Sequence, residues 1–418
     1  MLLIEREKQT KTAVVCPVEK NSQSGLIDSD LNNRVTEAEG LVMAMGQAVV
    51  FVDIIKYTKI ISGTFFGKGV IERIKQKITD NEVELLVFDG SLSPVQQRNL
   101  EKILNVKVID RTAVILEIFG RRAQTKEGKL QVELAHLTYQ RGRLVRSWTH
   151  LERQRGGGGF LGGPGETQME LDRRRLDERI VKIKKELEKV KQTRGIQRAA
   201  RVRVPYPTVA LVGYTNAGKS TLFNFITKAE VFAKDMLFAT LDPTMRKVEL
   251  GSGVDIILSD TVGFISNLPH ELVMAFRATL EEVLEADIIL HVIDASNPLF
   301  KEQRQDVLQV LAELGLDKIE NNNSYMEVFN KTDLLSQSEK ENLTKHYGKA
   351  VFVSALNGAG IDNLLEKIKS YFINSQKIEK IVVPIVDGRK LAEIYRSTEV
   401  LDRREDDNNI YLCVRHME

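Results

Sequence analysis

The stretch Gly213-Tyr-Thr-Asn-Ala-Gly-Lys-Ser220 decides the fold of the chain around it. It fits the pattern G-x-x-x-x-G-K-[S/T], in which glycines let backbone N–H groups turn inward around a triphosphate. In such a loop the lysine ammonium contacts the β- and γ-phosphates, and the serine hydroxyl is a ligand of Mg²⁺. Residues 208–212 predict a buried strand before the loop, and residues 220–226 predict a helix after it, whose N-terminus favours phosphate. This order of strand, loop and helix predicts a nucleotide-binding domain rather than a chance glycine-rich turn.

Asn330-Lys-Thr-Asp333 predicts that the base of the nucleotide is guanine. An aspartate carboxylate here accepts hydrogen bonds from guanine N1–H and N2–H₂, whereas adenine would leave it desolvated and unpaired. A polar turn after a strand would look the same in isolation, but the motif follows a phosphate loop. Ser354-Ala-Leu356 follows the strand-like residues 350–353 and offers a backbone N–H to guanine O6.

Two further motifs lie between the phosphate loop and the guanine motif. Asp260-Thr-Val-Gly263 follows the strand-like residues 254–258, so its aspartate would hold Mg²⁺ through water and its glycine N–H would meet the γ-phosphate. Thr240 has the position of a switch threonine, which binds Mg²⁺ only while the γ-phosphate is present, although an ordinary loop threonine is the alternative. The predicted catalytic groups are Lys219, Thr240 and Gly263, and the predicted Mg²⁺ ligands are Ser220 and Thr240.

Phe264 and Asn216 bear on how fast the nucleotide is hydrolysed. Many GTPases carry, at the position of Phe264, a glutamine that orients the attacking water; phenylalanine has no donor or acceptor and cannot do this. Slow hydrolysis that depends on an outside activator is therefore predicted, the alternative being an ordinary apolar residue in a mobile loop. Asn216 offers a carbonyl oxygen near the α- and β-phosphates, where similar GTPases hold K⁺; the alternative is that it satisfies the loop backbone.

The composition of the chain sets broad limits on its class. The 418 residues are 42% hydrophobic and 28% charged, which suits roughly two or three globular domains. No apolar run is long enough for a transmembrane helix, and the charged N-terminus lacks the apolar core of a signal peptide. Cys16 and Cys413 lie near opposite ends without metal-ligand spacing, which favours a reducing cytoplasm.

Positive charge is concentrated in one segment. Residues 121–203 contain 22 Lys and Arg against 10 Asp and Glu, although the whole chain has a net charge of only +2. Such a segment predicts contact with a polyanion, and we favour nucleic acid over a solvated helical face or acidic lipids. The predicted RNA contacts are Arg141, Arg143, Arg146, Arg153 and Arg155, with Trp148 and Phe160 as surfaces for base stacking.

Periodicity predicts four parts, at residues 1–109, 110–203, 205–374 and 375–418. The first alternates strand-like and helix-like segments, which predicts a small α/β domain with a parallel sheet. The second has apolar residues at helical spacing on both sides of a glycine-rich stretch at residues 155–165, which predicts an antiparallel helical hairpin with a flexible tip, or else a linker. The third carries the nucleotide motifs. In the fourth, strands are predicted at residues 380–385 and 409–414, a helix at 389–395, and a polar loop at 402–409.

Gly163-Pro-Gly-Glu-Thr-Gln-Met-Glu170, together with the nucleotide motifs above, resembles the HflX family of GTPases over essentially the whole chain. The resemblance implies an α/β multidomain fold: an N-terminal parallel-sheet α/β domain, a two-helix hairpin, a Ras-like P-loop G domain and a small C-terminal α+β module. It also implies a cytoplasmic GTPase that binds the large (50S) ribosomal subunit and its rRNA, and that dissociates stalled 70S ribosomes under stress. The GTP-bound state would bind and hydrolysis would permit release.

The resemblance implies the nucleotide contacts and Mg²⁺ as cofactor, while K⁺ remains open, and a monomer is our default. A regulatory switch acting on a protein or a membrane surface is the alternative function, and an RNA-remodelling enzyme with a second nucleotide in residues 1–109 ranks last. The implied contacts with GTP or GDP are Gly213, Tyr214, Thr215, Asn216, Ala217, Gly218, Lys219, Ser220, Phe238, Ala239, Thr240, Leu241, Asp242, Asp260, Thr261, Val262, Gly263, Asn330, Lys331, Thr332, Asp333, Ser354, Ala355 and Leu356.

Overall fold

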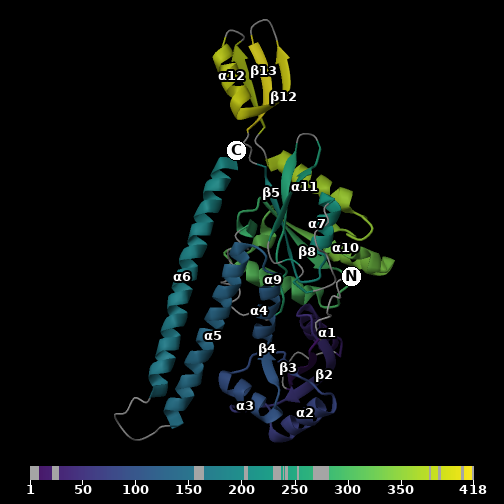
Figure 1. The fold of residues 1–418 in the computed structure, drawn as a ribbon. Coiled ribbons are helices and arrows are strands. Elements are labelled where there is room, and N and C mark those ends of the chain that lie inside the picture. The colour runs from purple at the N-terminus through teal and green to yellow at the C-terminus, as the bar shows by residue number, and fades with distance from the viewer. Residues whose placement is uncertain are drawn as a thin grey trace, which may run out of the picture.

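The computed structural model describes residues 9–20, 28–154, 164–201, 206–228, 237–238, 240, 243–251, 254–266, 282–375, 378–384, 387–405 and 409–416. These residues form three separate β-sheets and a pair of long helices that lie side by side along one flank of the molecule (Figure 1). Within the described part of the chain, no helix is both long and apolar enough to span a membrane.

The first sheet is parallel, in the strand order β2-β1-β3-β4. Its strand β1 is buried except at its two ends, as expected for a parallel strand covered on both faces. The parallel α/β domain predicted for the N-terminal part is therefore confirmed. Its elements are β1 (Lys11–Glu19), α1 (Asp28–Ala44), β2 (Ala48–Tyr57), α2 (Lys68–Asp80), β3 (Leu85–Phe88), α3 (Pro94–Leu104), β4 (Lys107–Asp110) and α4 (Arg111–Arg122).

The two long helices, α5 (Lys126–Gln154) and α6 (Pro164–Arg201), form the predicted antiparallel hairpin (Figure 1). Ile180 and Ile183 of α6 are buried, because their apolar stripe packs against α5. Exposed ion pairs also join the helices, with Arg141 Nε 2.7 Å from Asp177 and Arg179 Nη2 2.6 Å from Glu133. Residues 155–163 of the predicted glycine-rich tip lie outside the described residues, whereas Pro164 and Gly165, predicted to belong to the tip, begin α6.

The second sheet has the order β10-β9-β8-β5-β7-β6 and is parallel except for the edge pair β6 and β7. Strand β5 lies inside the sheet and leads directly into the phosphate-loop motif, so the carboxyl ends of β5, β7 and β9 bring the three nucleotide motifs to one edge. Its elements are β5 (Thr208–Gly213), α7 (Lys219–Thr227), β6 (Thr244–Glu249), β7 (Asp255–Asp260), β8 (Ile288–Asp294), α9 (Phe300–Glu313), β9 (Tyr325–Asn330), α10 (Gln337–His346), β10 (Val351–Phe352) and α11 (Ile361–Ser375).

The C-terminal module is a three-stranded antiparallel sheet in the order β11-β13-β12, with one helix against it. The polar loop predicted at residues 402–409 is wrong for residues 402–405, which belong to an edge strand, and for Asn409, which begins the next strand; residues 406–408 lie outside the described residues. Arg404 pairs across the sheet with Tyr411, and its side chain is exposed, so charge on this edge does not oppose the pairing. The elements are β11 (Ile378–Pro384), α12 (Gly388–Ser397), β12 (Thr398–Glu405) and β13 (Asn409–His416).

The first and second sheets share a hydrophobic core through helices α1 and α4. One continuous cluster of buried side chains includes Leu41 of α1 and Phe119 of α4 as well as Phe238 and Phe264 of the nucleotide-binding part. The Phe119 and Phe238 rings meet edge to face, with centroids 4.6 Å apart. The N-terminal helices therefore pack directly on segments that the sequence assigns to the nucleotide switch.

Candidate nucleotide-binding site

The phosphate loop connects β5 to α7, and two of its glycines cannot be replaced without a clash. Gly213 has φ +151°, and a Cβ there would lie 2.2 Å from the carbonyl oxygen of Val292. Gly218 has φ +90°, and its Cβ would lie 2.2 Å from Nδ2 of Asn330. The glycines of the motif are thus explained by close approach and by a backbone conformation that favours glycine.

Lys219 lies buried at the start of α7, beside the predicted γ-phosphate contact. Its Nζ donates hydrogen bonds to the carbonyl oxygens of Gly213 at 3.0 Å and Tyr214 at 2.8 Å. A Cβ placed on Gly263 would lie 3.0 Å from the same Nζ. Burial lowers the pKa of Lys219 to about 8, against the raising effect of Asp260. An ammonium held in so little water interacts strongly with an added phosphate group.

The predicted Mg²⁺ ligands meet at one point of the site. The Ser220 hydroxyl lies 2.8 Å from the Thr240 hydroxyl, and Oδ2 of Asp260 accepts a hydrogen bond from each, at 2.6 and 3.0 Å. Burial raises the pKa of Asp260, while the hydrogen bond from Ser220 and the charge of Lys219 lower it. Oδ1 of Asp260 is buried without a hydrogen-bond partner among the described residues. Hard oxygen donors gathered around a buried carboxylate fit Mg²⁺, because this ion prefers oxygen ligands.

The guanine motif is tied to the phosphate loop by Asn330. Its side-chain amide donates to the carbonyl oxygen of Ala217 at 2.9 Å and accepts from the N–H of Ala355 at 2.9 Å. The neighbouring Asp333 accepts a hydrogen bond from the Ser354 hydroxyl at 2.5 Å. Asp333 itself is exposed, so its carboxylate is accessible to a base. The structure therefore brings together the phosphate loop, the Asn330–Asp333 motif and the segment that begins at Ser354, which the sequence assigned to one nucleotide.

Several predicted contacts have side chains that are buried in the protein. Tyr214 and Phe238 are directed toward the N-terminal helices, and the hydroxyl of Thr261 donates to the carbonyl oxygen of Leu211 at 2.6 Å. The nucleotide contacts predicted for these three residues would therefore be made by their backbone atoms. Phe264 is 1% exposed, and its ring packs in the hydrophobic core between the first and second sheets. The predicted contacts Ala239, Leu241 and Asp242 lie outside the described residues.

Asn216 has an exposed side chain and φ +61°, a left-handed conformation that asparagine tolerates better than most residues. The backbone geometry alone thus gives a reason for asparagine at this position. A role in holding K⁺ stays a prediction.

The arginines predicted to bind RNA differ in their surroundings. Arg141 pairs with Asp177, as described above, and Arg143 is half-buried. The Arg143 guanidinium donates to Asp110 at 3.1 Å, to the Tyr139 hydroxyl at 2.8 Å and to the Leu92 carbonyl at 3.2 Å. Arg143 therefore anchors α5 to the first sheet. The side chains of Arg146, Arg153 and Arg155, and of Trp148 and Phe160, lie outside the described residues.

Exposed lysines on α6 were missed in the sequence analysis. Lys185 and Lys189 are exposed and, at 100° per residue, lie on the helix face opposite Ile183. Composition had already indicated this surface, because the whole segment is basic. The apolar period of α6 could have identified which of its charges face outward.

His291 of β8 gives the protein a predicted dependence of stability on pH. Burial lowers the pKa of His291 to about 3, helped by the charges of Arg304 and Lys219. Below pH 6.5 the unfolded chain binds a proton that the folded chain refuses, so stability falls as the pH falls toward 3. Between pH 6.5 and 5.5 the free energy of unfolding therefore falls by about 1 kcal/mol. Between pH 7.5 and 5.5, the melting temperature of the wild type should fall by about 2–4 °C more than that of His291→Gln.

The matched control for this measurement is His346→Gln on α10. His346 is exposed, so this variant should follow the wild type at every pH. Parallel melting curves of the wild type and His291→Gln across the pH range would contradict the assignment.

The chain is similar to known proteins along most of its length. Three family models match: "GTP-binding GTPase N-terminal" at residues 32–120, "GTP-binding GTPase Middle Region" at 122–201 and "50S ribosome-binding GTPase" at 208–331. The chain is 49% identical to GTPase HflX of Magnetococcus marinus over 369 residues, which are 88% of this chain and 84% of that protein. It is 45% identical to GTPase HflX of Escherichia coli over 354 residues, 84% and 82% of the two chains. A GTP-binding protein from Sulfolobus solfataricus, solved with GDP, is similar with a TM-score of 0.46 and 26% identity, over 87% of this chain and 99% of that one.

Proposed function

This chain belongs to the HflX family and is a GTPase, and from this premise we propose that it binds the large ribosomal subunit and, when GTP-bound, dissociates stalled 70S ribosomes. Hydrolysis would permit its release, so that each GTP drives one cycle of binding and departure. The proposal includes a cytoplasmic location and action as a monomer. Its support is the match to a model described as a 50S ribosome-binding GTPase, together with the basic helical hairpin.

The observation that carries the proposal is the outward face of α6. Arg174, Lys185 and Lys189 are exposed there, on a helix that lies beside α5 (Figure 1) and that buries Ile180 and Ile183. No acidic side chain of the described residues lies within ion-pair distance of these three cations. Cations held on a rigid helix and open to solvent suit the phosphate backbone of rRNA.

We also propose how the site hydrolyses GTP. Lys219 neutralises charge on the β- and γ-phosphates, the Gly263 N–H donates to the γ-phosphate, and Asp333 selects guanine. Ser220 and Thr240 would hold Mg²⁺, which neutralises phosphate charge when bound. Because Phe264 is buried and apolar, an outside group has to orient the attacking water, and the ribosome is the proposed source of that group.

The proposal is tested by steady-state GTP hydrolysis with and without purified large subunits, in potassium and in sodium buffer. Strong stimulation by the subunits is expected, since the activating group would be supplied in trans. A requirement for potassium would give Asn216 its ionic role. Absence of stimulation in both salts would contradict the ribosome as activator and would favour a protein or membrane partner.

Reversing charge on α6 should weaken ribosome binding. In Lys185→Glu/Lys189→Glu, basal hydrolysis should be unchanged, because both residues are exposed on α6 and belong to none of the nucleotide motifs. The affinity for large subunits should fall about tenfold or more, and the slope of log affinity against log salt should become shallower by about one to two. Co-sedimentation at several salt concentrations measures both quantities.

Lys345→Glu/Lys349→Glu is the matched control, because it makes the same charge change at two exposed positions, one on α10 and one just after it. Equal losses in the two double variants would show an effect of net charge rather than of α6. If the protein binds anionic vesicles and added ribosomes do not displace it from them, the membrane alternative would be supported instead.

A further inference from the structure

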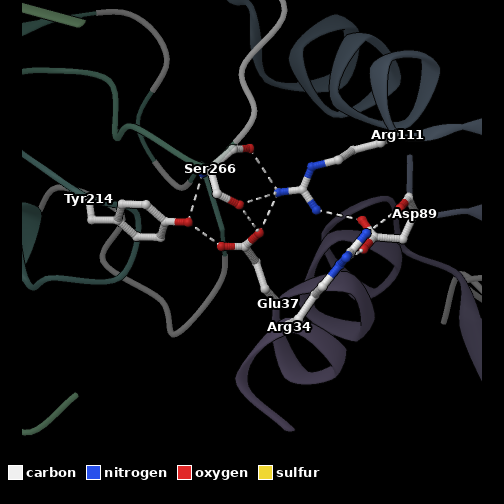
Figure 2. A network of polar contacts seen from close by, with 6 residues as sticks. All are labelled: Arg34, Glu37, Asp89, Arg111, Tyr214 and Ser266. Carbon is white, nitrogen blue, oxygen red and sulfur yellow. Dashed lines mark hydrogen bonds and ion pairs between the residues drawn. The ribbon is translucent and has the colours of Figure 1, made fainter. Parts of the chain in front are cut away.

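A network of buried and half-buried polar residues joins the N-terminal domain to the nucleotide site (Figure 2). Glu37 lies on α1, and its two carboxylate oxygens accept hydrogen bonds from the Tyr214 hydroxyl and, at 2.9 Å, from the Ser266 hydroxyl. The Arg111 guanidinium pairs with Glu37 and donates to the Ser266 carbonyl at 3.1 Å. Tyr214 belongs to the phosphate loop, and Ser266 closely follows Gly263, so one carboxylate contacts both segments.

The charges of this network are fixed by their surroundings. Arg111 is only 6% exposed, and its other side pairs with Asp89, which in turn accepts a hydrogen bond from Arg34 at 2.9 Å. Burial opposes the charge of Arg111, but Glu37 and Asp89 raise its pKa, so the guanidinium stays charged. Burial and the charge of Glu37 raise the pKa of Tyr214, so its hydroxyl keeps its proton. Nε of Arg111 is buried without a hydrogen-bond partner among the described residues, but both of its terminal nitrogens are bonded, and these bonds hold Glu37, Asp89 and Ser266 around it.

The network continues to the predicted γ-phosphate contact through the backbone. The Tyr214 hydroxyl accepts the N–H of Ser266 at 2.7 Å. The N–H of Thr215 donates to the Phe264 carbonyl at 2.6 Å, and the N–H of Phe264 donates to the Gly213 carbonyl at 3.1 Å. The segment from Gly263 to Ser266 is thereby bonded to the phosphate loop at one end and to Glu37 at the other, and Gly263 itself lies against Lys219.

We propose that Glu37 and Arg111 are positioning residues for GTP hydrolysis. Through Ser266 and Tyr214 they hold Gly263 where its N–H meets a γ-phosphate. In the same structure the hydroxyls of Ser220 and Thr240 both bond to Asp260, so the network occurs together with a close grouping of the predicted Mg²⁺ ligands. The edge-to-face contact of Phe119 with Phe238 also joins the N-terminal domain to the segment of Thr240, the predicted switch threonine. GDP lacks the γ-phosphate and gains little from this positioning.

The test compares Glu37→Gln with Glu72→Gln, which makes the same charge change at an exposed position of α2 in the same domain. Equilibrium binding is measured for GDP and for a GTP analogue with a non-hydrolysable β–γ bridge. In Glu37→Gln, the affinity for the analogue should fall about tenfold and that for GDP less than about twofold, since the coupling acts on the triphosphate state. The kcat for GTP should also fall, whereas Glu72→Gln should match the wild type in every measurement.

A second variant removes the hydroxyl without touching the charges. Tyr214→Phe should show the same selective loss for the analogue, and its effect should not add to that of Glu37→Gln, because both break one network. Equal losses for GDP and the analogue, or no loss in either variant, would overturn the proposal. A melting temperature close to that of the wild type shows that a variant is folded.

The proposal rests on the assigned phosphate loop but not on the ribosome. Lys219→Ala distinguishes failure of the site assignment from failure of the positioning role. If this variant binds both nucleotides with wild-type affinity, the site assignment itself fails. If it loses binding while Glu37→Gln keeps the wild-type ratio of analogue to GDP affinity, only the positioning role fails.

Discussion

Replacing Lys219 by alanine should lower kcat/KM for GTP by about a thousandfold. The Lys219 ammonium is buried beside Gly263, where the γ-phosphate is expected, and it bonds only to the carbonyl oxygens of Gly213 and Tyr214 among the described residues. A charge in so dry a place stabilises developing phosphate charge far more than an exposed lysine does. Its loss also removes one donor from each of these carbonyl oxygens, which keep the N–H groups of Phe264 and Ala217 as donors. Single-turnover and steady-state hydrolysis with saturating Mg²⁺ measure the effect.

Lys345→Ala, at an exposed position of α10, is the control for this variant. It should hydrolyse GTP at the wild-type rate. If Lys219→Ala kept more than a tenth of the wild-type kcat/KM while remaining folded, the phosphate loop would not be the site of hydrolysis.

The nucleotide site could be predicted from sequence because its chemistry is local. Gly213 and Gly218 are required by backbone conformation and close contacts, and Lys219 follows at once on the same loop. The parallel sheets follow from apolar strands alternating with helices, since each buried strand reads as a continuous apolar run. The order of the motifs along the chain then places them at one edge of the second sheet.

The direction of side chains could not be predicted in the same way. Tyr214 occupies a variable position of the phosphate-loop pattern, yet its hydroxyl reaches Glu37, which is 177 residues away in the sequence. Ser266 and Glu37 are separated by 229 residues. No local period or motif specifies such a contact, because it arises only when α1 and α4 pack on the switch segments.

Charge composition has a similar limit. The excess of Lys and Arg in residues 121–203 identified a basic segment, but it could not show which cations have acidic partners. Arg143 fits the composition of an RNA contact, yet it bonds to Asp110 and Tyr139. Strand β12 shows the same limit for secondary structure, because its polar residues pair on an exposed edge where hydropathy gives no signal.

Replacing Asp333 by asparagine should change which base the protein accepts. A carboxylate accepts both guanine donors, N1–H and N2–H₂, and two charge-assisted hydrogen bonds at about 1.5–3 kcal/mol each predict a loss of GTP affinity of about 10³-fold. Asparagine presents one acceptor and one donor group instead. Xanthine keeps N1–H and has a carbonyl oxygen where guanine has N2–H₂, so it complements the new side chain. Hydrolysis of xanthosine triphosphate should therefore rise as that of GTP falls, measured by competition between the two nucleotides.

The surroundings of Asp333 make this exchange of specificity a test of base recognition rather than of folding. Asp333 is exposed, and the Ser354 hydroxyl, which donates to it at 2.5 Å, can donate equally to an asparagine carbonyl oxygen. Asn330, which ties the guanine motif to the phosphate loop, is unchanged in the variant. Asp317→Asn, at an exposed position in the same part of the chain, should leave both affinities as in the wild type. A variant at Asp333 that loses GTP without gaining xanthosine triphosphate would indicate a general weakening of the site, whereas unchanged GTP affinity would show that another group reads the base.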